Sequence, residues 1–321
     1  MTETQAIPPK PAAATVAVKT DPTKNVGAIK ATAVQADTAF TISSGDDDFE
    51  YLNMLVYAQP GAGKTTLCGS AADVEEMRDV IMLDFESGKM TIKNNPRIKH
   101  PEFVDTIRIT NFKQLGKVHE FLKIHCRLRD QGKEEELKVL QAKFFGVTPD
   151  KVKRVRHYRT VLVDSVSELD TLSMYEMLGI STVDDLNKVM NDGDVEVAQF
   201  AEFRKNNQMM QLVIRAYRDL PMNAIFVCHA SFMQDELKRV LWAPALTGKL
   251  AKQIQGFVDI VGYLKVGEIP AGTDQKEGPR RFYVQPVGKF DAKCRVASFK
   301  ESWLDNPVMQ DVWDICTSED D

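Results

Sequence analysis

The sequence lacks the cysteine patterns that mark disulfide frameworks and zinc sites. Its five cysteines are odd in number and scattered, and none forms a Cys-x-x-Cys pair. Small secreted domains are held together by paired cysteines, and structural zinc sites need closely spaced thiolates. We therefore expect a protein of a reducing compartment, the cytoplasm, whose thiols stay unpaired.

Long apolar runs and an excess of positive charge are also missing. No run approaches 18 apolar residues, and the first ten residues, MTETQAIPPK, are polar, so we expect neither a membrane-spanning helix nor a signal peptide. The 41 basic and 46 acidic residues give a net charge of −5. A general basic coat that would hold nucleic acid is therefore absent, and any nucleic-acid site must be local.

Residues 1–48 have little that could form a core. They contain no leucine and one aromatic residue, Phe40, and they end in three aspartates. Such a segment cannot bury enough apolar surface to offset its ordering entropy, so we expect a disordered tail.

The 321 residues are 43% hydrophobic, which suffices for one or two domains. We expect one domain over 49–300 and a C-terminal extension, 301–321, with an acidic tip.

Short apolar runs alternate with helical patterns after residue 49. This alternation is typical of an α/β fold with a mostly parallel sheet flanked by helices. The pattern predicts strands at 52–57, 80–84, 106–109, 160–164 and 224–229. It predicts helices at 64–72, 112–129, 166–178 and 195–219. Two later extended segments, 257–266 and 281–287, flank a turn-rich stretch and predict a hairpin at one edge of the sheet.

A glycine-rich segment joins the first predicted strand to the first predicted helix. It fits the phosphate-binding loop (P-loop) pattern Ala/Gly-x4-Gly-Lys-Ser/Thr and supplies the expected nucleotide-binding residues Ala58, Gln59, Pro60, Gly61, Ala62, Gly63, Lys64, Thr65 and Thr66. Its glycines let successive N–H groups point inward, and the helix N-terminus favours an anion at the same place. We expect Lys64 to contact the β- and γ-phosphates of ATP and Thr65 to bind Mg²⁺. An accidental glycine-rich turn is the alternative, which the flanking strand and helix disfavour.

Two strand ends supply the acidic groups that a nucleotide site needs. One apolar run ends in Asp164, which we expect to hold Mg²⁺ through a water molecule, and a helix N-cap role for Asp164 or Ser165 is compatible with this. Because residue 165 is not glutamate, the base that activates water must come from elsewhere. The strand after the P-loop runs into Asp84 and Glu86, and Glu86 can face the γ-phosphate and activate the attacking water. The alternative is that both carboxylates merely solvate a strand end.

Four segments in order, AQPGAGKTT, LDFESG, VLVDSVSEL and FVCHA, together resemble the RecA-like ATPase core over residues 51–265. More narrowly, the layout resembles the phage-encoded AAA/RecA-type proteins that include the fourth Sak group of single-strand-annealing ATPases. The resemblance implies a Mg²⁺-dependent ATPase that binds single-stranded DNA in phage recombination, replication or repair. It implies a homo-oligomer, ring or filament, in the cytoplasm of a bacterial host.

The resemblance also implies roles for single residues. Glu86 takes the position of the catalytic glutamate, and His229, at the end of the fifth predicted strand, takes that of a γ-phosphate sensor, with a structural histidine as the alternative. Lys293 and Arg295 resemble the Lys-x-Arg pair that acts in the neighbouring subunit's site, and Lys249 is a second candidate. Solvated surface charge is the alternative for each of these three.

In RecA-like folds the loops after the acidic and sensor strands contact DNA. The segment after the sensor strand offers Phe232 and Trp242 for stacking on bases, and Lys238 and Arg239 for phosphates. An amphipathic edge with its aromatic residues in the core is the alternative. A second basic cluster, 151–159, could simply solvate a connection, and the acidic residues at the C-terminus are a candidate contact for a single-strand-binding protein.

Two other functions would use the same P-loop. One is a small-molecule or nucleotide kinase, although an Arg-rich lid is not evident. The other is a nucleotide-regulated replication adaptor or loader that binds ATP with little turnover. Annealing, strand exchange and helicase loading reuse such a core with different surfaces, so the motifs alone do not separate them.

Overall fold

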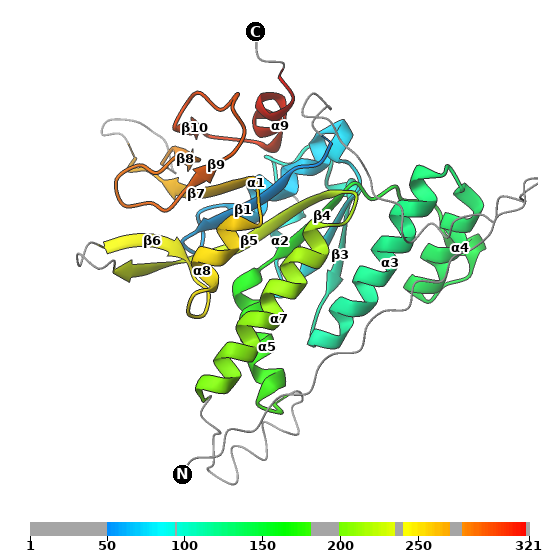
Figure 1. Cartoon of the computed structure of the whole chain (residues 1–321). Helices are drawn as coiled ribbons and strands as arrows, with labels where there is room; N and C mark the ends of the chain where they lie inside the picture. Colours follow the sequence, from blue (N-terminus) through cyan, green and yellow to red (C-terminus); the bar gives the residue numbers. More distant parts are fainter. Residues whose placement is uncertain (1–49, 94, 181–198, 235–239, 270–277, 319–321) are drawn as a thin grey trace, which may run out of the picture. The chain divides into compact units, whose positions relative to one another are not determined.

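The apolar runs of the sequence form the strands of one sheet in the computed structural model (Figure 1). The structure describes residues 50–93, 95–180, 199–234, 240–269 and 278–318. The tail predicted at 1–48 and the acidic residues 319–321 lie outside the described residues.

Six strands of the described chain run parallel, in the order β7-β1-β5-β4-β2-β3. They are β1 (Asn53–Ala58), β2 (Val80–Asp84), β3 (Val104–Arg108), β4 (Thr160–Asp164), β5 (Asn223–Gln234) and β7 (Ile260–Val266). Their interior members are almost entirely apolar because both faces of a parallel sheet are covered. β5 lies between β1, which leads into the P-loop, and the acidic strand β4.

Shorter strands pair antiparallel with this set. They are β6 (Val240–Pro244) on β5, β8 (Arg280–Tyr283) and β9 (Lys293–Cys294) on β7, and β10 (Trp303–Asp305) on β8. The predicted edge hairpin is therefore present as β7 and β8. β8 ends before Pro286, which has no N–H to donate to a neighbouring strand. Residues after 300 contribute β10 to the same sheet.

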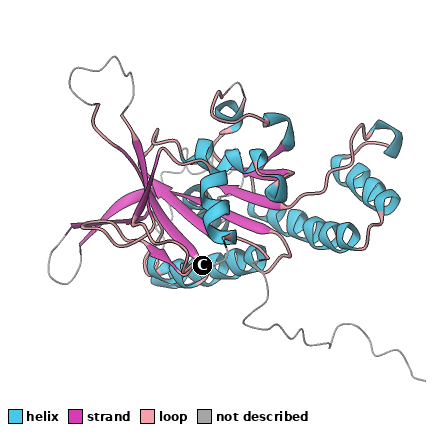
Figure 2. Cartoon of the chain, turned by 90° about the horizontal axis from the view of Figure 1, so that it is seen from above, coloured by secondary structure: helices cyan, strands magenta, loops and turns pink. Residues whose placement is uncertain are grey.

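Helices cover both faces of the sheet (Figures 1 and 2). One face is covered by α3 (Phe112–Asp130), α5 (Val166–Met177), α7 (Phe200–Arg218) and α8 (Leu250–Gln253). The other face is covered by α1 (Lys64–Gly69), α2 (Lys89–Ile92) and α9 (Met309–Thr317). The short 3₁₀ turns are Ser70–Asp73, Glu75–Met77, Pro101–Phe103, Pro149–Lys151 and Ile254–Gly256.

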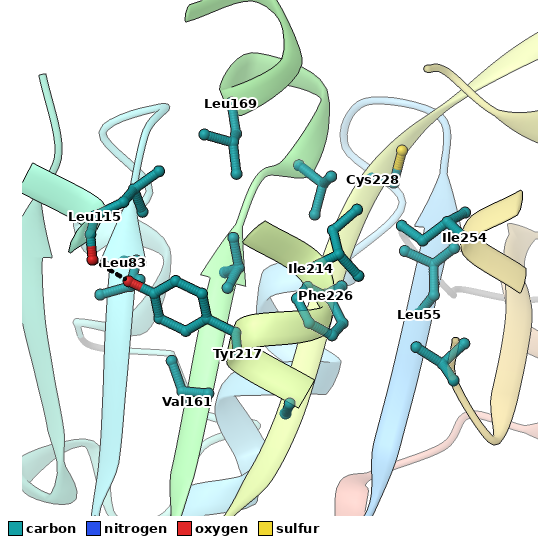
Figure 3. Packing of buried hydrophobic residues seen from close by; sticks show 14 of the residues in the cluster. Leu55, Leu83, Leu115, Val161, Leu169, Ile214, Tyr217, Phe226, Cys228 and Ile254 are labelled. Carbon is teal, nitrogen blue, oxygen red and sulfur yellow. Dashed lines mark hydrogen bonds between the residues drawn. The ribbon is translucent and has the colours of Figure 1, made fainter. Parts of the chain in front are cut away.

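Alternate residues of each strand enter opposite cores, as the two-residue period of a strand requires. Leu55 packs in the cluster under α7, whereas Met54 and Val56 pack in the cluster under α9. In the first cluster the hydroxyl of Tyr217 donates a 2.9 Å hydrogen bond to the carbonyl of Leu115 (Figure 3). Each fully buried aliphatic or aromatic side chain stabilises the fold by about 1.5–3 kcal/mol. These rows of contacts hold the strand ends in fixed positions.

The structure differs from the sequence predictions at several element boundaries. The helix predicted at 64–72 is α-helical to Gly69 and continues as a 3₁₀ turn, and β5 extends five residues beyond His229, to Gln234, to pair with β6. α4 (Glu134–Phe145) and α9 are additional helices that the patterns do not predict. Residues 195–198 of the helix predicted at 195–219 lie outside the described residues.

Candidate functional site

The predicted phosphate, metal and base residues follow neighbouring parallel strands. Asp84 of β2 pairs with Asp164 of β4, and Ala58 of β1 pairs with His229 of β5. Because parallel strands end at the same edge of a sheet, the segments after them converge there. The fold thereby brings together four segments that are widely separated in the sequence.

The P-loop curls as the glycine positions predict. Gly61 and Gly63 have φ of 76° and 97°, which residues with a Cβ rarely adopt. The ammonium of Lys64 is buried and donates to the carbonyls of Ala58 at 3.3 Å and Gln59 at 3.4 Å. Burial lowers the pKa of Lys64, while the nearby carboxylates of the site oppose this shift. The ammonium of Lys64 therefore lies against the first residues of the loop.

The hydroxyl of Thr65 donates a 2.6 Å hydrogen bond to Oδ2 of Asp164. Asp164 is 2% exposed, and burial raises its pKa to about 6, partly opposed by this hydrogen bond. A threonine hydroxyl and a carboxylate are oxygen groups of the kind that hold Mg²⁺, directly or through water. The two predicted metal residues therefore lie together, in an arrangement that fits Mg²⁺.

Glu86 follows β2 and contacts Ser165, just after β4, and His229 of β5. Its Oε1 is 2.9 Å from Nε2 of His229, and the hydroxyl of Ser165 donates to the same oxygen. The hydrogen bond from His229 lowers the pKa of Glu86, so the carboxylate is ionised at neutral pH. Glu168, from the first turn of α5, joins this pair, and one ligand atom from each of Glu86, Glu168 and His229 lies within 4.8 Å of the others.

The two carboxylates after β2 have different surroundings. Asp84 is buried, and its Oδ1 accepts from the backbone N–H groups of Glu86 at 3.1 Å and Gly88 at 2.8 Å. Asp84 therefore fixes the turn that carries Glu86. The interpretation as simple solvation of a strand end does not fit Asp84.

α5 begins with two serines that support the site. Ser165 is the N-cap of α5 and accepts from the N–H of Glu168 at 3.3 Å, so the N-cap interpretation is confirmed for this residue. Ser167 accepts from the N–H of His229 at 3.0 Å and donates to the carbonyl of Ala245 at 3.0 Å. Ser167 was not predicted from the sequence, although it sits three residues after Asp164 in VDSVSE and a side-chain oxygen there can reach the next strand.

A cavity of about 370 Å³ lies beside the outer side of the P-loop. Its walls are residues 59–62 of the loop and residues 263–266 at the end of β7. Thr66 of the loop accepts a 2.9 Å hydrogen bond from the side chain of Asn95. The P-loop is thus bordered by β7 on one side and by the segment after α2 on the other.

The candidates for a role in a neighbouring subunit lie away from the P-loop of their own chain. The ammonium of Lys293 donates to the carbonyls of Gln255 at 2.6 Å and Val258 at 3.2 Å. Arg295 donates to the carbonyl of Gly256 at 3.0 Å. Lys249 precedes α8 and borders a groove of about 600 Å³ against α7. A role of these cations in a second subunit stays a prediction.

The predicted DNA segment forms an antiparallel hairpin of β5 and β6. Phe232 pairs with Trp242, and their ring centroids are 3.6 Å apart. Phe232 is 64% exposed, whereas Trp242 is partly buried against the core. Lys238 and Arg239 lie outside the described residues. The exposed ring of Phe232 is the part of this predicted contact that the structure places at the surface.

Two arginines of the second basic cluster are paired within the chain. Arg154 and Arg156 each donate to Oδ1 of Asp79 at 3.2 Å, and Arg156 also contacts Asp105 at 2.8 Å. The guanidinium of Arg154 lies 4.0 Å from the ring centroid of Phe103. These contacts favour the structural interpretation of the cluster.

The architecture corresponds to a known class of nucleotide-binding fold. The parallel sheet, the P-loop after its first strand and the converging strand ends define a RecA-like P-loop nucleotide-binding domain. The model of the AAA domain family matches residues 50–296, and the chain belongs to this family. The comparison with curated proteins gives no match.

Among solved structures, the flagellar accessory protein FlaH from Methanocaldococcus jannaschii is similar to this chain. The similarity covers 72% of this chain and 76% of that protein, with 8% identity and a TM-score of 0.32.

Of the helices that the structure describes, none has the length and apolar character needed to cross a membrane.

Proposed function

We propose that this protein binds ATP with Mg²⁺ and hydrolyses it to ADP and phosphate. The observation that carries the proposal is the 2.6 Å contact between Thr65 and Asp164, with the ionised Glu86 on the adjacent strand end. The N–H groups of the P-loop would receive the phosphates, and Lys64 would exchange its two carbonyl contacts for phosphate oxygens. Thr65 and Asp164 would hold Mg²⁺, which when bound would supply positive charge to neutralise the phosphates.

The proposed chemistry gives separate roles to Glu86 and His229. Glu86 orients the attacking water and accepts its proton at a carboxylate oxygen. His229 contacts that same carboxylate, so it is placed to report whether the γ-phosphate is present. Ser165 and Ser167 hold Glu86 and the backbone of His229, respectively, in position.

We also propose that single-stranded DNA is the macromolecular partner and that the protein acts in phage recombination, replication or repair as a homo-oligomer. The support is the order of the four RecA-like motifs and the hairpin that follows the sensor strand. His229 and the exposed Phe232 lie three residues apart on β5, so a change at the γ-phosphate can reach a ring that can stack on a base.

Phosphate release from ATP with Mg²⁺, with and without single-stranded DNA, tests this function. Lys64→Ala is the control for contaminating activity. Hydrolysis that DNA stimulates, and that Lys64→Ala abolishes, supports the proposal. Hydrolysis that DNA leaves unchanged would refute the coupling, a phosphorylated acceptor would indicate a kinase, and saturable ATP binding without turnover would indicate an adaptor or loader.

A further inference from the structure

Arg280, at the start of β8, reaches the P-loop although it follows Lys64 by more than 200 residues. Its Nε donates a 3.1 Å hydrogen bond to the carbonyl of Ala62. The guanidinium also covers Gly63, because a Cβ at that glycine would lie 3.0 Å from Nε of Arg280. A side chain at residue 63 would therefore force the guanidinium to move by a few tenths of an ångström.

The hydrogen bond between Arg280 and Ala62 affects the direction in which a phosphate-binding N–H group of the loop points. The carbonyl of Ala62 and the N–H of Gly63 belong to one planar trans peptide unit, in which the C=O and N–H bonds point in opposite directions. A donor that fixes the carbonyl on the outside of the loop therefore aims the N–H of Gly63 toward the inside. In a P-loop the inward N–H groups are those that receive the phosphates.

The arginine is itself held in place by the C-terminal part of the chain. Its backbone N–H donates to the side chain of Asn306 at 2.9 Å, and the N–H of Asn306 donates to the carbonyl of Arg280 at 2.6 Å. Arg280 also pairs with Val266 at the end of β7. The edge strands thus connect residues near 306 to the P-loop.

We propose that Arg280 is a positioning residue for nucleotide binding, which braces the P-loop from its outer side and orients the N–H of Gly63 toward the phosphates. This proposal rests on the ATP-binding function proposed above. It assigns a role in nucleotide affinity to the edge strands β8 and β10. Arg280 is expected to act through the loop backbone, so its loss should affect affinity more than the chemical step.

The test compares Arg280→Ala with Arg281→Ala, its neighbour on the same strand. Arg281 is exposed, and its Nε contacts Asp305 at 2.7 Å. Arg281→Ala therefore controls for a general disruption of β8 and β10. ATP affinity would be measured with a fluorescent ATP analogue and Mg²⁺, together with KM, kcat and the melting temperature without nucleotide. We expect Arg280→Ala to weaken binding by roughly 10- to 100-fold, since hydrogen bonds from charged groups contribute at this level.

Two further results separate positioning from structure. Arg280→Lys keeps a charged donor and should recover part of the affinity, and Arg280→Ala should raise KM more than it lowers kcat. ATP binding by Arg280→Ala equal to that of the wild type, or an equal loss in Arg281→Ala, would overturn the proposal. A wild-type protein that binds no ATP would instead refute the proposed function itself.

Discussion

Nε2 of His229 lies 2.9 Å from Oε1 of Glu86, although β4 separates the strands that carry these residues. Ser165, which follows β4, donates to the same carboxylate oxygen. Side chains from three adjacent strands, or from the residues just after them, therefore meet at Glu86. We therefore expect a change in the position of this carboxylate to affect β5 and the hairpin that it forms with β6.

We expect His229→Ala to lower kcat by about 10²-fold, the usual effect of removing one donor from a catalytic electrostatic network. ATP affinity should stay within about threefold of the wild type, because His229 does not belong to the P-loop. Steady-state phosphate release and ATP titration measure the two effects. An unchanged kcat would show that His229 is structural, which is the alternative interpretation of a histidine at a strand end.

The buried Asp164 should make the unliganded protein less stable as pH rises. Its pKa is raised to about 6 in the folded state from 3.8, so its favourable contribution is complete below pH 3.8 and is lost as pH rises through about 6. Asp164→Asn should therefore raise the unfolding free energy at pH 7.5, by up to about 3 kcal/mol. Denaturant titrations at pH 7.5 and pH 4 measure this difference, which should shrink at the lower pH.

The same variant separates stability from function. With Mg²⁺ and ATP present, the unfolding free energy of Asp164→Asn should no longer exceed that of the wild type, because the wild-type carboxylate then has a cation to interact with. Equal stabilisation of both proteins by Mg²⁺ and ATP would contradict the assignment of Asp164 to the metal.

Much of the site could be predicted because its residues directly follow apolar strands. Lys64, Asp164 and Glu86 each follow an apolar run, and parallel strands bring such positions together whatever the rest of the chain does. The local pattern of apolar and polar residues is therefore enough to predict that these three residues lie near one another. Their roles in catalysis stay predictions.

Other residues of the site carried no such signal. Glu168 reaches it from the first turn of a helix, and Arg280 from β8, a strand whose position in the sheet the sequence does not specify. The sequence pattern does not predict β6, because this strand is short and contains Pro244, and proline disfavours a strand. Tertiary contacts, rather than local propensity, place these residues.

Phe232→Ala should weaken binding of single-stranded DNA, because the exposed ring is a stacking surface. A base stacked on an aromatic ring contributes about 1–3 kcal/mol, which corresponds to roughly 5- to 150-fold in Kd. Fluorescence anisotropy of a labelled oligonucleotide measures the loss, and hydrolysis without DNA should be unchanged. Phe200→Ala, which removes an 85% exposed ring on α7, is the matched control. Equal DNA affinity of the wild type and the Phe232 variant would exclude this ring from the DNA contact.

Asp79→Asn should destabilise the fold without a direct effect on the nucleotide site. Asp79 is 4% exposed and accepts from Arg154, Arg156 and the N–H of His157. Removing its charge takes one carboxylate from both guanidinium groups, of which Arg156 keeps Asp105, and should lower the unfolding free energy by about 1–3 kcal/mol. Urea denaturation measures the change, with the exposed Asp150→Asn as control. A loss no larger than that of the control would show that the cluster is solvated charge.

The most direct test of the account is hydrolysis by Glu86→Gln. The amide keeps the size of the side chain but cannot accept a proton from water, so ATP binding should persist while kcat falls by about 10²- to 10⁴-fold. ATP affinity with Mg²⁺ and single-turnover phosphate release would be measured on the same preparation. Retained binding with this loss of turnover is the predicted result. Turnover equal to that of the wild type would contradict Glu86 as the base, and with it the central claim about this site.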